Sequence, residues 1–140
     1  MTTTEPRAGG VLVDANVLLD IFIEDPTWAA WSETALVEAL DVGPLIINPI
    51  VYAEIAVRFE RIEELEDALP RQIEREALPW EAAFLAGKRF LAYRRRGGPK
   101  RSPLPDFYIG AHALVTGRVL LTRDASRYRT AFPSLALISP

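Results

Sequence analysis

Four acidic residues of this sequence stand where their side chains could act together: Asp14, Glu54, Asp106 and Asp124. The first and the last follow apolar runs, the third begins a predicted helix after a Leu-Pro step, and Glu54 lies within another predicted helix. Four converging carboxylates would repel one another, and each would be costly to remove from water. A divalent cation offsets both costs. Mg²⁺ and Mn²⁺ prefer such hard oxygen ligands, polarise phosphoryl oxygens and supply a bound hydroxide. The set therefore predicts a metal site for phosphodiester chemistry.

Each acid also has a structural alternative. The three aspartates could be helix N-caps, where such a residue contributes about 1 kcal/mol, and Glu54 could be a solvated surface residue. The distribution of charge favours a common role. Residues 82–140 hold 11 basic residues and 2 acidic ones, Asp106 and Asp124, whereas residues 1–81 hold 17 acidic and 5 basic residues. This partition, hidden in a net charge of −3, indicates an interaction surface, although the halves could also neutralise each other across the fold.

Short apolar strands alternate with helices along the chain. The expected strands cover 10–13, 45–47, 119–121 and 135–138, and the expected helices cover 15–23, 26–40, 49–59, 63–69, 79–97 and 106–116. This alternation predicts an α/β fold in which helices cover both faces of a parallel sheet. Ligands of such sheets bind at the carboxyl ends of the strands, which Asp14 and Asp124 follow. We expect a frayed tail at residues 1–9 and one domain over residues 10–140.

The composition excludes several classes of protein. The chain has no cysteine and one histidine, so it cannot build a thiolate or multi-histidine metal site by itself. It has no glycine-rich nucleotide loop, and no apolar run reaches the roughly 18 residues of a membrane span. The polar N-terminus lacks the apolar stretch of a secretory signal, which favours a soluble cytoplasmic protein.

Three segments carry a resemblance to a known family. Residues 11–20 look like the opening of PIN-domain nucleases, residues 104–113 look like their third-acid motif, and residues 120–133 are similar to their carboxy-terminal motif. The branch that the chain most resembles is the VapC-type ribonuclease toxins of toxin–antitoxin pairs. The resemblance implies a PIN-like three-layer α/β/α fold around a central parallel sheet of about four to five strands.

The same resemblance implies a function and its residues. Metal-binding and catalytic acids would be Asp14, Glu54, Asp106 and Asp124, and polar supporting residues would be Asn16 and Thr122. The family implies cleavage of RNA with Mg²⁺ or Mn²⁺ that leaves 5′-phosphate and 3′-hydroxyl ends. It also implies a homodimer, and inhibition by a small cognate antitoxin that covers the active site of this type II toxin.

Other functions remain possible on the sequence alone. A non-catalytic PIN scaffold would bind RNA or a protein without cutting, and its acids would be caps or a structural metal site. A haloacid-dehalogenase-type phosphatase would need a second aspartate where Asn16 stands. A Ser-His-Asp hydrolase would have to use His112, which is better interpreted as a packed or surface residue of a helix.

Basic residues near the predicted site indicate how RNA would be held. The candidates for contacts with the RNA backbone are Arg94, Arg95, Arg96, Lys100, Arg101 and Arg123, and Arg118, Arg127 and Arg129 extend this track. Phosphate contacts of this kind give affinity without sequence information. The alternative for residues 94–101 is a solvated loop.

Overall fold

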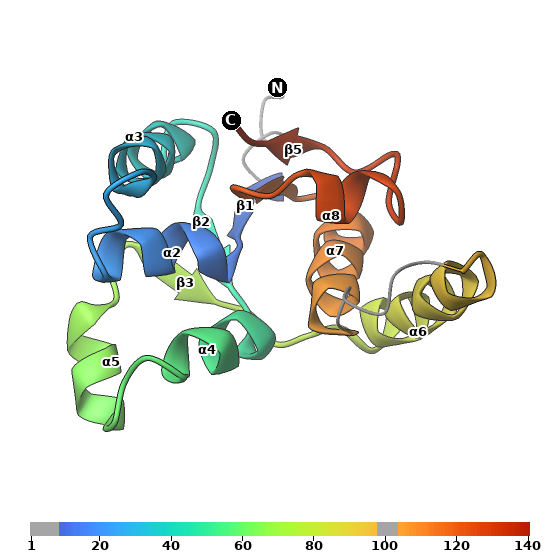
Figure 1. Cartoon of the computed structure of the whole chain (residues 1–140), viewed down its shortest axis with the longest axis horizontal. Helices are drawn as coiled ribbons and strands as arrows, with labels where there is room; N and C mark the ends of the chain where they lie inside the picture. The colour runs from blue at the N-terminus through green and yellow to red at the C-terminus, as the bar shows by residue number, and fades with distance from the viewer. Residues whose placement is uncertain (1–8, 98–103) are drawn as a thin grey trace.

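Five parallel strands form the centre of the molecule, in the order β3-β2-β1-β4-β5 (Figure 1). They are β1 (Val11–Val13), β2 (Leu45–Ile47), β3 (Ile73–Arg75), β4 (Val119–Leu121) and β5 (Leu137–Ile138). The computed structural model describes residues 9–97 and 104–140. Most of the predicted tail, residues 1–8, and the predicted RNA contacts Lys100 and Arg101 lie outside the described residues.

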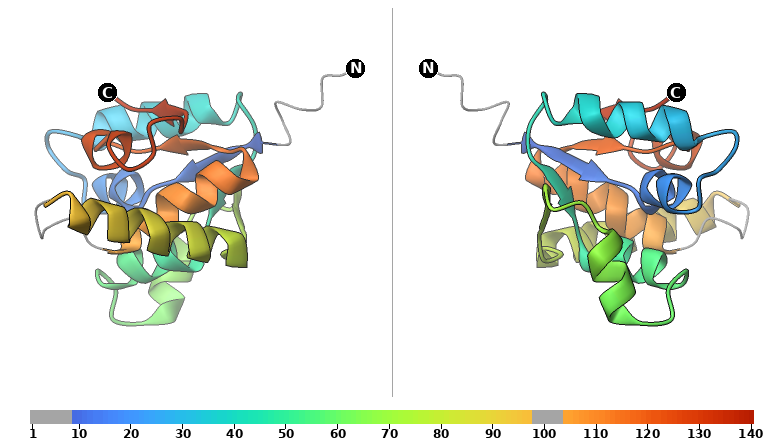
Figure 2. Two further views of the ribbon diagram at one scale, coloured as in Figure 1. Left: turned by 90° about the vertical axis from the view of Figure 1, so that its right-hand side faces the viewer. Right: turned by 90° about the vertical axis from the view of Figure 1, so that its left-hand side faces the viewer.

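Helices cover both faces of this sheet, as the sequence predicts. The helices of the described residues are α2 (Ala15–Phe22), α3 (Ala29–Ala39), α4 (Pro49–Ala56), α5 (Ile62–Ala68), α6 (Trp80–Arg95), α7 (Leu104–Thr116) and α8 (Ser126–Arg129). Figure 2 shows α3 on one side of the sheet and α6 with α7 on the other. The predicted three-layer α/β/α fold with a parallel sheet is confirmed. No helix in the two described ranges is long and apolar enough to cross a membrane.

The central strand β1 brings the two ends of the sequence together. Val11 pairs with Leu45 of β2 on one side and with Val119 of β4 on the other. All three residues of β1 are fully buried, which explains why its sequence is an uninterrupted apolar run. Because β1 and β4 are neighbours, the residues that follow both strands meet at one edge of the sheet.

Most predicted elements begin and end within three residues of the observed bounds, and two differences need an explanation. Strand β3 was not predicted, because Ile73-Glu74-Arg75 is an exposed edge strand with one apolar residue and no buried run to mark it. Helix α7 begins at Leu104 rather than at Asp106, so this aspartate lies within the first turn and does not start the helix. Proline at position 105 is compatible with that first turn, where no backbone donor is needed.

A buried polar network, rather than a catalytic triad, explains the single histidine. The Asn48 carbonyl oxygen accepts from the Val51 amide, so its NH₂ group donates to His112 Nδ1 at 2.9 Å. The other ring nitrogen, Nε2, therefore carries the proton and donates to Glu76 at 2.7 Å. Burial lowers the pKa of His112, which keeps the ring neutral. Glu76 also pairs with Arg118, so the network connects α7 to the ends of β2 and β3 and to the start of β4.

The C-terminal segment packs against α7 through an aromatic cluster. Phe107 lies between Phe90 and Phe132, with ring centroids 5.3 and 6.2 Å away. Gly110 faces the same buried Phe132 ring, and a Cβ atom at position 110 would lie 2.6 Å from it. A side chain there would push the C-terminal segment away from α7.

This close approach predicts opposite effects of alanine at two helical glycines. We expect Gly110→Ala to lower the free energy of unfolding by about 1–3 kcal/mol, because the Phe132 ring is buried and cannot move freely. Gly87→Ala in α6 is the matched control. A Cβ at position 87 meets no described atom within 4 Å, so alanine should stabilise the helix by about 0.5–1 kcal/mol. Urea unfolding of both variants tests the expectation, and equal effects would contradict it.

Candidate active site

Three carboxylates from three different elements line one open cavity of about 370 Å³. Asp14 comes from the N-cap of α2, Glu54 from α4, and Asp106 from the first turn of α7. The cavity lies at the carboxyl end of β1, the edge at which parallel sheets bind ligands. Asn16, Arg58 and Arg127 also line it. The structure thus brings together three of the four acids selected from the sequence.

Asp14 is the best anchored of these acids. Its backbone amide continues the sheet ladder to the Leu121 carbonyl at 2.9 Å, which places it beside Thr122. Its Oδ1 accepts from the Ala15 amide, at the first residue of α2, at 2.8 Å. Its Oδ2 accepts from the hydroxyls of Thr122 and Tyr128, each at 2.8 Å. Burial raises the pKa of Asp14 and these hydrogen bonds oppose the rise, so the donors offset part of the loss of water.

The two predicted supporting residues lie beside this carboxylate. Asn16 Nδ2 is 3.4 Å from Asp14 Oδ2 and 3.3 Å from the Thr122 hydroxyl, and its carbonyl accepts from the Arg123 amide. Thr122 in turn accepts from the Asp124 amide at 3.1 Å. Tyr128 was not selected from the sequence as a site residue. Its position four residues after Asp124 gives no signal, because its role depends on how α8 folds back over β1.

Glu54 and Asp106 have pKa values close to neutrality. Burial, followed by the charges of Asp14 and Asp106, raises the pKa of Glu54 to about 7. Burial raises the pKa of Asp106 to about 6, although Arg127 opposes the rise. Glu54 makes no hydrogen bond or ion pair with any other residue in the described ranges, and no aspartate of the site shares that property. Such shifted carboxyls are typical of catalytic sites.

Asp124 stands apart from the cavity and is connected to it by Arg127. The Arg127 Nε atom lies 2.9 Å from Asp124 Oδ2, and its Nη1 atom lies 3.3 Å from Asp106 Oδ2. No three Asp, Glu, His or Cys side chains within residues 9–97 and 104–140 are arranged closely enough to hold a metal ion. The chemistry of the four acids fits Mg²⁺ or Mn²⁺, whereas their present arrangement pairs two of them with an arginine.

The predicted RNA contacts have different surroundings. Arg94, Arg95 and Arg96 are exposed at the C-terminal end of α6, where the Arg94 guanidinium lies over the Phe90 ring. Arg123 instead forms a two-point ion pair with buried Asp20, at 2.8 and 2.9 Å, and lies over the Trp28 ring. Arg123 therefore has a structural role that joins the end of β4 to α2 and α3. Arg58, which the sequence did not single out, lines the acidic cavity.

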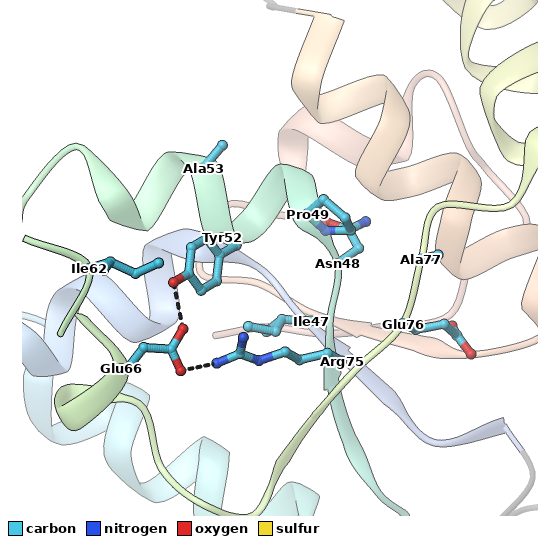
Figure 3. A pocket seen from close by; sticks show the side chains of 10 residues that line it. All are labelled: Ile47, Asn48, Pro49, Tyr52, Ala53, Ile62, Glu66, Arg75, Glu76 and Ala77. Atoms are coloured by element: carbon cyan, nitrogen blue, oxygen red, sulfur yellow. Dashed lines mark hydrogen bonds and ion pairs between the residues drawn. The ribbon is translucent and has the colours of Figure 1, made fainter. Parts of the chain in front are cut away.

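A larger cavity of about 470 Å³ opens between α4, α5 and the segment after β3. Its polar groups pair mainly with one another, as Figure 3 shows: Tyr52 donates to Glu66, and Arg75 pairs with the same carboxylate, both at 2.6 Å. The rest of the lining is largely apolar. This larger cavity offers no comparable group of acids. The acidic cavity is therefore the better candidate for an active site.

Comparisons with known proteins agree with this fold. Residues 11–133 match the family model of the PIN domain. The fold is similar to a chain of the VapBC2 structure from Rickettsia felis bound to a promoter DNA fragment. The TM-score is 0.72 at 17% identity over 92% of this chain and 97% of that one. A search of the curated proteins finds no match.

Two further solved structures have the same fold. VapBC-1 from nontypeable Haemophilus influenzae has a TM-score of 0.70 at 17% identity, over 92% of this chain and 96% of that one. A toxin-antitoxin complex from Klebsiella pneumoniae has a TM-score of 0.62 at 19% identity, over 92% and 96% of the two chains. At such identities the likeness establishes the fold.

The raised pKa of Glu54 predicts a pH-dependent stability. The folded state holds the proton to a higher pH than the unfolded chain does. The resulting stabilisation is therefore complete below about pH 4.5 and is lost as the pH rises through about 7. In EDTA at pH 8, we expect Glu54→Gln to be more stable than the wild type by about 1 kcal/mol, allowing for solvent screening. Near pH 5 the two proteins should have similar free energies of unfolding.

Thermal and urea unfolding at both pH values measure this difference. Glu33→Gln, an exposed residue of α3, is the control and should show no such pH dependence. A difference between Glu54→Gln and the wild type that is the same at both pH values would show that titration of Glu54 is not its cause.

Proposed function

Because the chain belongs to the PIN-domain family, we propose that it is a metal-dependent endoribonuclease and the toxin of a type II toxin–antitoxin pair. The observation that carries this proposal is the cavity in which Asp14, Glu54 and Asp106 meet beside two arginines. Acids alone at this edge could be structural. Acids with raised pKa values next to cations that can bind phosphate are suited to cleaving an RNA backbone.

The four acids share the binding of a metal ion in this proposal, and Glu54 has a further role. Asp14, Glu54, Asp106 and Asp124 would hold Mg²⁺ or Mn²⁺, which polarises a phosphoryl oxygen and activates water when bound. Asn16, Thr122 and Tyr128 orient the Asp14 carboxylate through the hydrogen bonds described above. Glu54, with no partner in the described ranges, is the carboxylate best placed to take a proton from water. Arg58 binds the RNA phosphate, and cleavage leaves 5′-phosphate and 3′-hydroxyl ends.

The proposed inhibitor is a small antitoxin protein that covers this cavity. Two observations support it: the similar folds are found in toxin–antitoxin complexes, and the cavity concentrates carboxylates that an inserted arginine or lysine would neutralise. An arginine or lysine side chain of the antitoxin would compete with the metal ion for the same carboxylate oxygens. The proposed substrate, cellular RNA, locates this activity in the cytoplasm.

A second copy of the chain is the proposed partner for the outer face of α6. Trp80 and Phe84, one helical turn apart, are 90% and 69% exposed. The helix begins with Glu81 and ends with Arg94 and Arg95. A two-fold axis perpendicular to α6 would align two such helices antiparallel, so that the acidic end of each meets the basic end of the other. This charge complementarity supports a homodimer through α6.

Loss of the acids should abolish RNA cleavage. We expect Asp106→Asn and Asp14→Asn to reduce Mg²⁺-dependent cleavage by more than the roughly 10–100-fold that accompanies loss of an outer-shell partner. Asp41→Asn, an exposed acid after α3, should cleave like the wild type. Sequencing the 5′ ends of RNA cut by purified protein, with and without EDTA, measures the activity. A folded wild type that binds RNA but does not cut it would instead favour a non-catalytic PIN scaffold.

Removal of the exposed aromatic side chains should weaken the dimer. Buried tryptophan in an interface typically contributes about 2 kcal/mol or more, so Trp80→Ala should raise the dimer dissociation constant by about 30-fold. Val37→Ala, which removes an exposed apolar side chain from α3 on the other side of the sheet, should leave it unchanged. Sedimentation velocity over a range of concentrations measures both. A wild type that is monomeric throughout that range would refute the proposed dimer.

A further inference from the structure

Arg127 is the cation that lies among the acids of the candidate active site. It lines the cavity with Asp14, Glu54 and Asp106, and it contacts two carboxylates with two different nitrogens. Asp106 is almost fully buried, with 6% of its side chain exposed, so its negative charge has little water to stabilise it. Arg127 is the nearest positive charge that can do so.

The contacts of Arg127 differ from those of a fixed structural arginine in the same structure. Arg123 makes two bonds to one buried carboxylate and rests on the Trp28 ring. Arg127 makes a single contact to each of two acids, at 3.3 and 2.9 Å, and 49% of its side chain is exposed. Half-exposed single contacts are weak and exchangeable, whereas a two-point pair with stacking is not.

The same two oxygens are the ones that a divalent ion would need. Asp106 Oδ2 and Asp124 Oδ2 both face the guanidinium, and among the described residues no three acids are arranged as a metal site. A guanidinium and a hard cation cannot occupy this position together, because they repel each other and compete for the same lone pairs.

We infer that Arg127 is a built-in counter-ion, which holds Asp106 and Asp124 in the metal-free protein and which the metal must displace. The inference rests on the proposed metal-dependent function and adds a regulatory step to it. Arg127 is a positioning residue in this scheme: it keeps the acids folded and near one another, at the cost of weaker metal binding.

Metal titration of the folded proteins tests this inference without measuring cleavage. Isothermal titration with Mn²⁺ should give a dissociation constant at least about threefold lower for Arg127→Gln than for the wild type, because a competing charge is removed. Arg129→Gln is the matched control. It lies on the same short helix, is exposed, and changes the net charge equally, so its dissociation constant should stay within about twofold of the wild type.

A second measurement uses the wild type alone. In this experiment diamagnetic Mg²⁺ takes the place of Mn²⁺ and is titrated into the metal-free protein to saturation. The Nε–Hε resonance of Arg127 should shift during the titration, because the contact with Asp124 is broken. A resonance that does not move would overturn the inference, even if Arg127→Gln fails to fold.

The outcomes separate this inference from the proposed function. A wild type that binds metal and cuts RNA, with unchanged or weaker metal binding in Arg127→Gln, would overturn the counter-ion role alone. Weaker binding would show that Arg127 arranges the ligands instead. A wild type that binds no metal would overturn both the inference and the proposed function.

Discussion

The buried carboxylate of Asp14 is the constraint around which the candidate site is built. A charge removed from water at the end of the central strand has to be compensated by nearby donors. The chain supplies them from three places: the first turn of α2, the end of β4 and helix α8. Each of these hydrogen bonds fixes the position of the element that carries the donor. Accordingly, the position of α8 follows from the need to stabilise Asp14, and α8 in turn carries Arg127 into the cavity.

The other two acids of the cavity make fewer contacts with the protein than Asp14 does. Glu54 has no partner within the described residues, and its pKa is raised to about 7. Asp106 has one long contact with a half-exposed arginine. The site therefore combines one acid whose position is fixed by several hydrogen bonds with two that are held less firmly. The raised pKa values of all three show that the protein alone does not stabilise their negative charges fully, and a bound cation would do so.

Much of the fold could be predicted because the buried strands are continuous apolar runs. Val11–Val13, Leu45–Ile47 and Val119–Leu121 are of this kind, and the rule that ligands bind at the carboxyl ends of parallel strands then selects Asp14. Strand β3 could not be predicted, because edge pairing uses backbone groups and leaves no pattern in Ile73–Arg75.

The pairs that side chains form within the site could not be predicted from the sequence, for a related reason. Arg123 and Arg127 both flank Asp124, yet one pairs with Asp20, 103 residues away, and the other with Asp106. Only the path of the chain after β4 decides between them. The role of Tyr128 depends on the same path, whereas Asn16 and Thr122 could be selected because they match polar positions of the family that the sequence resembles.

The pairing of β1 with β4 has a consequence for the order of synthesis. Asp14 leaves the ribosome early, while the hydroxyls that stabilise it belong to residues 108 and 114 positions later. A nascent chain that ends before Thr122 already contains Asp14 and Glu54 but has neither of the two hydroxyl donors to Asp14. The acidic cavity is thus one of the last parts of the molecule to assemble, and a prematurely released chain would lack it.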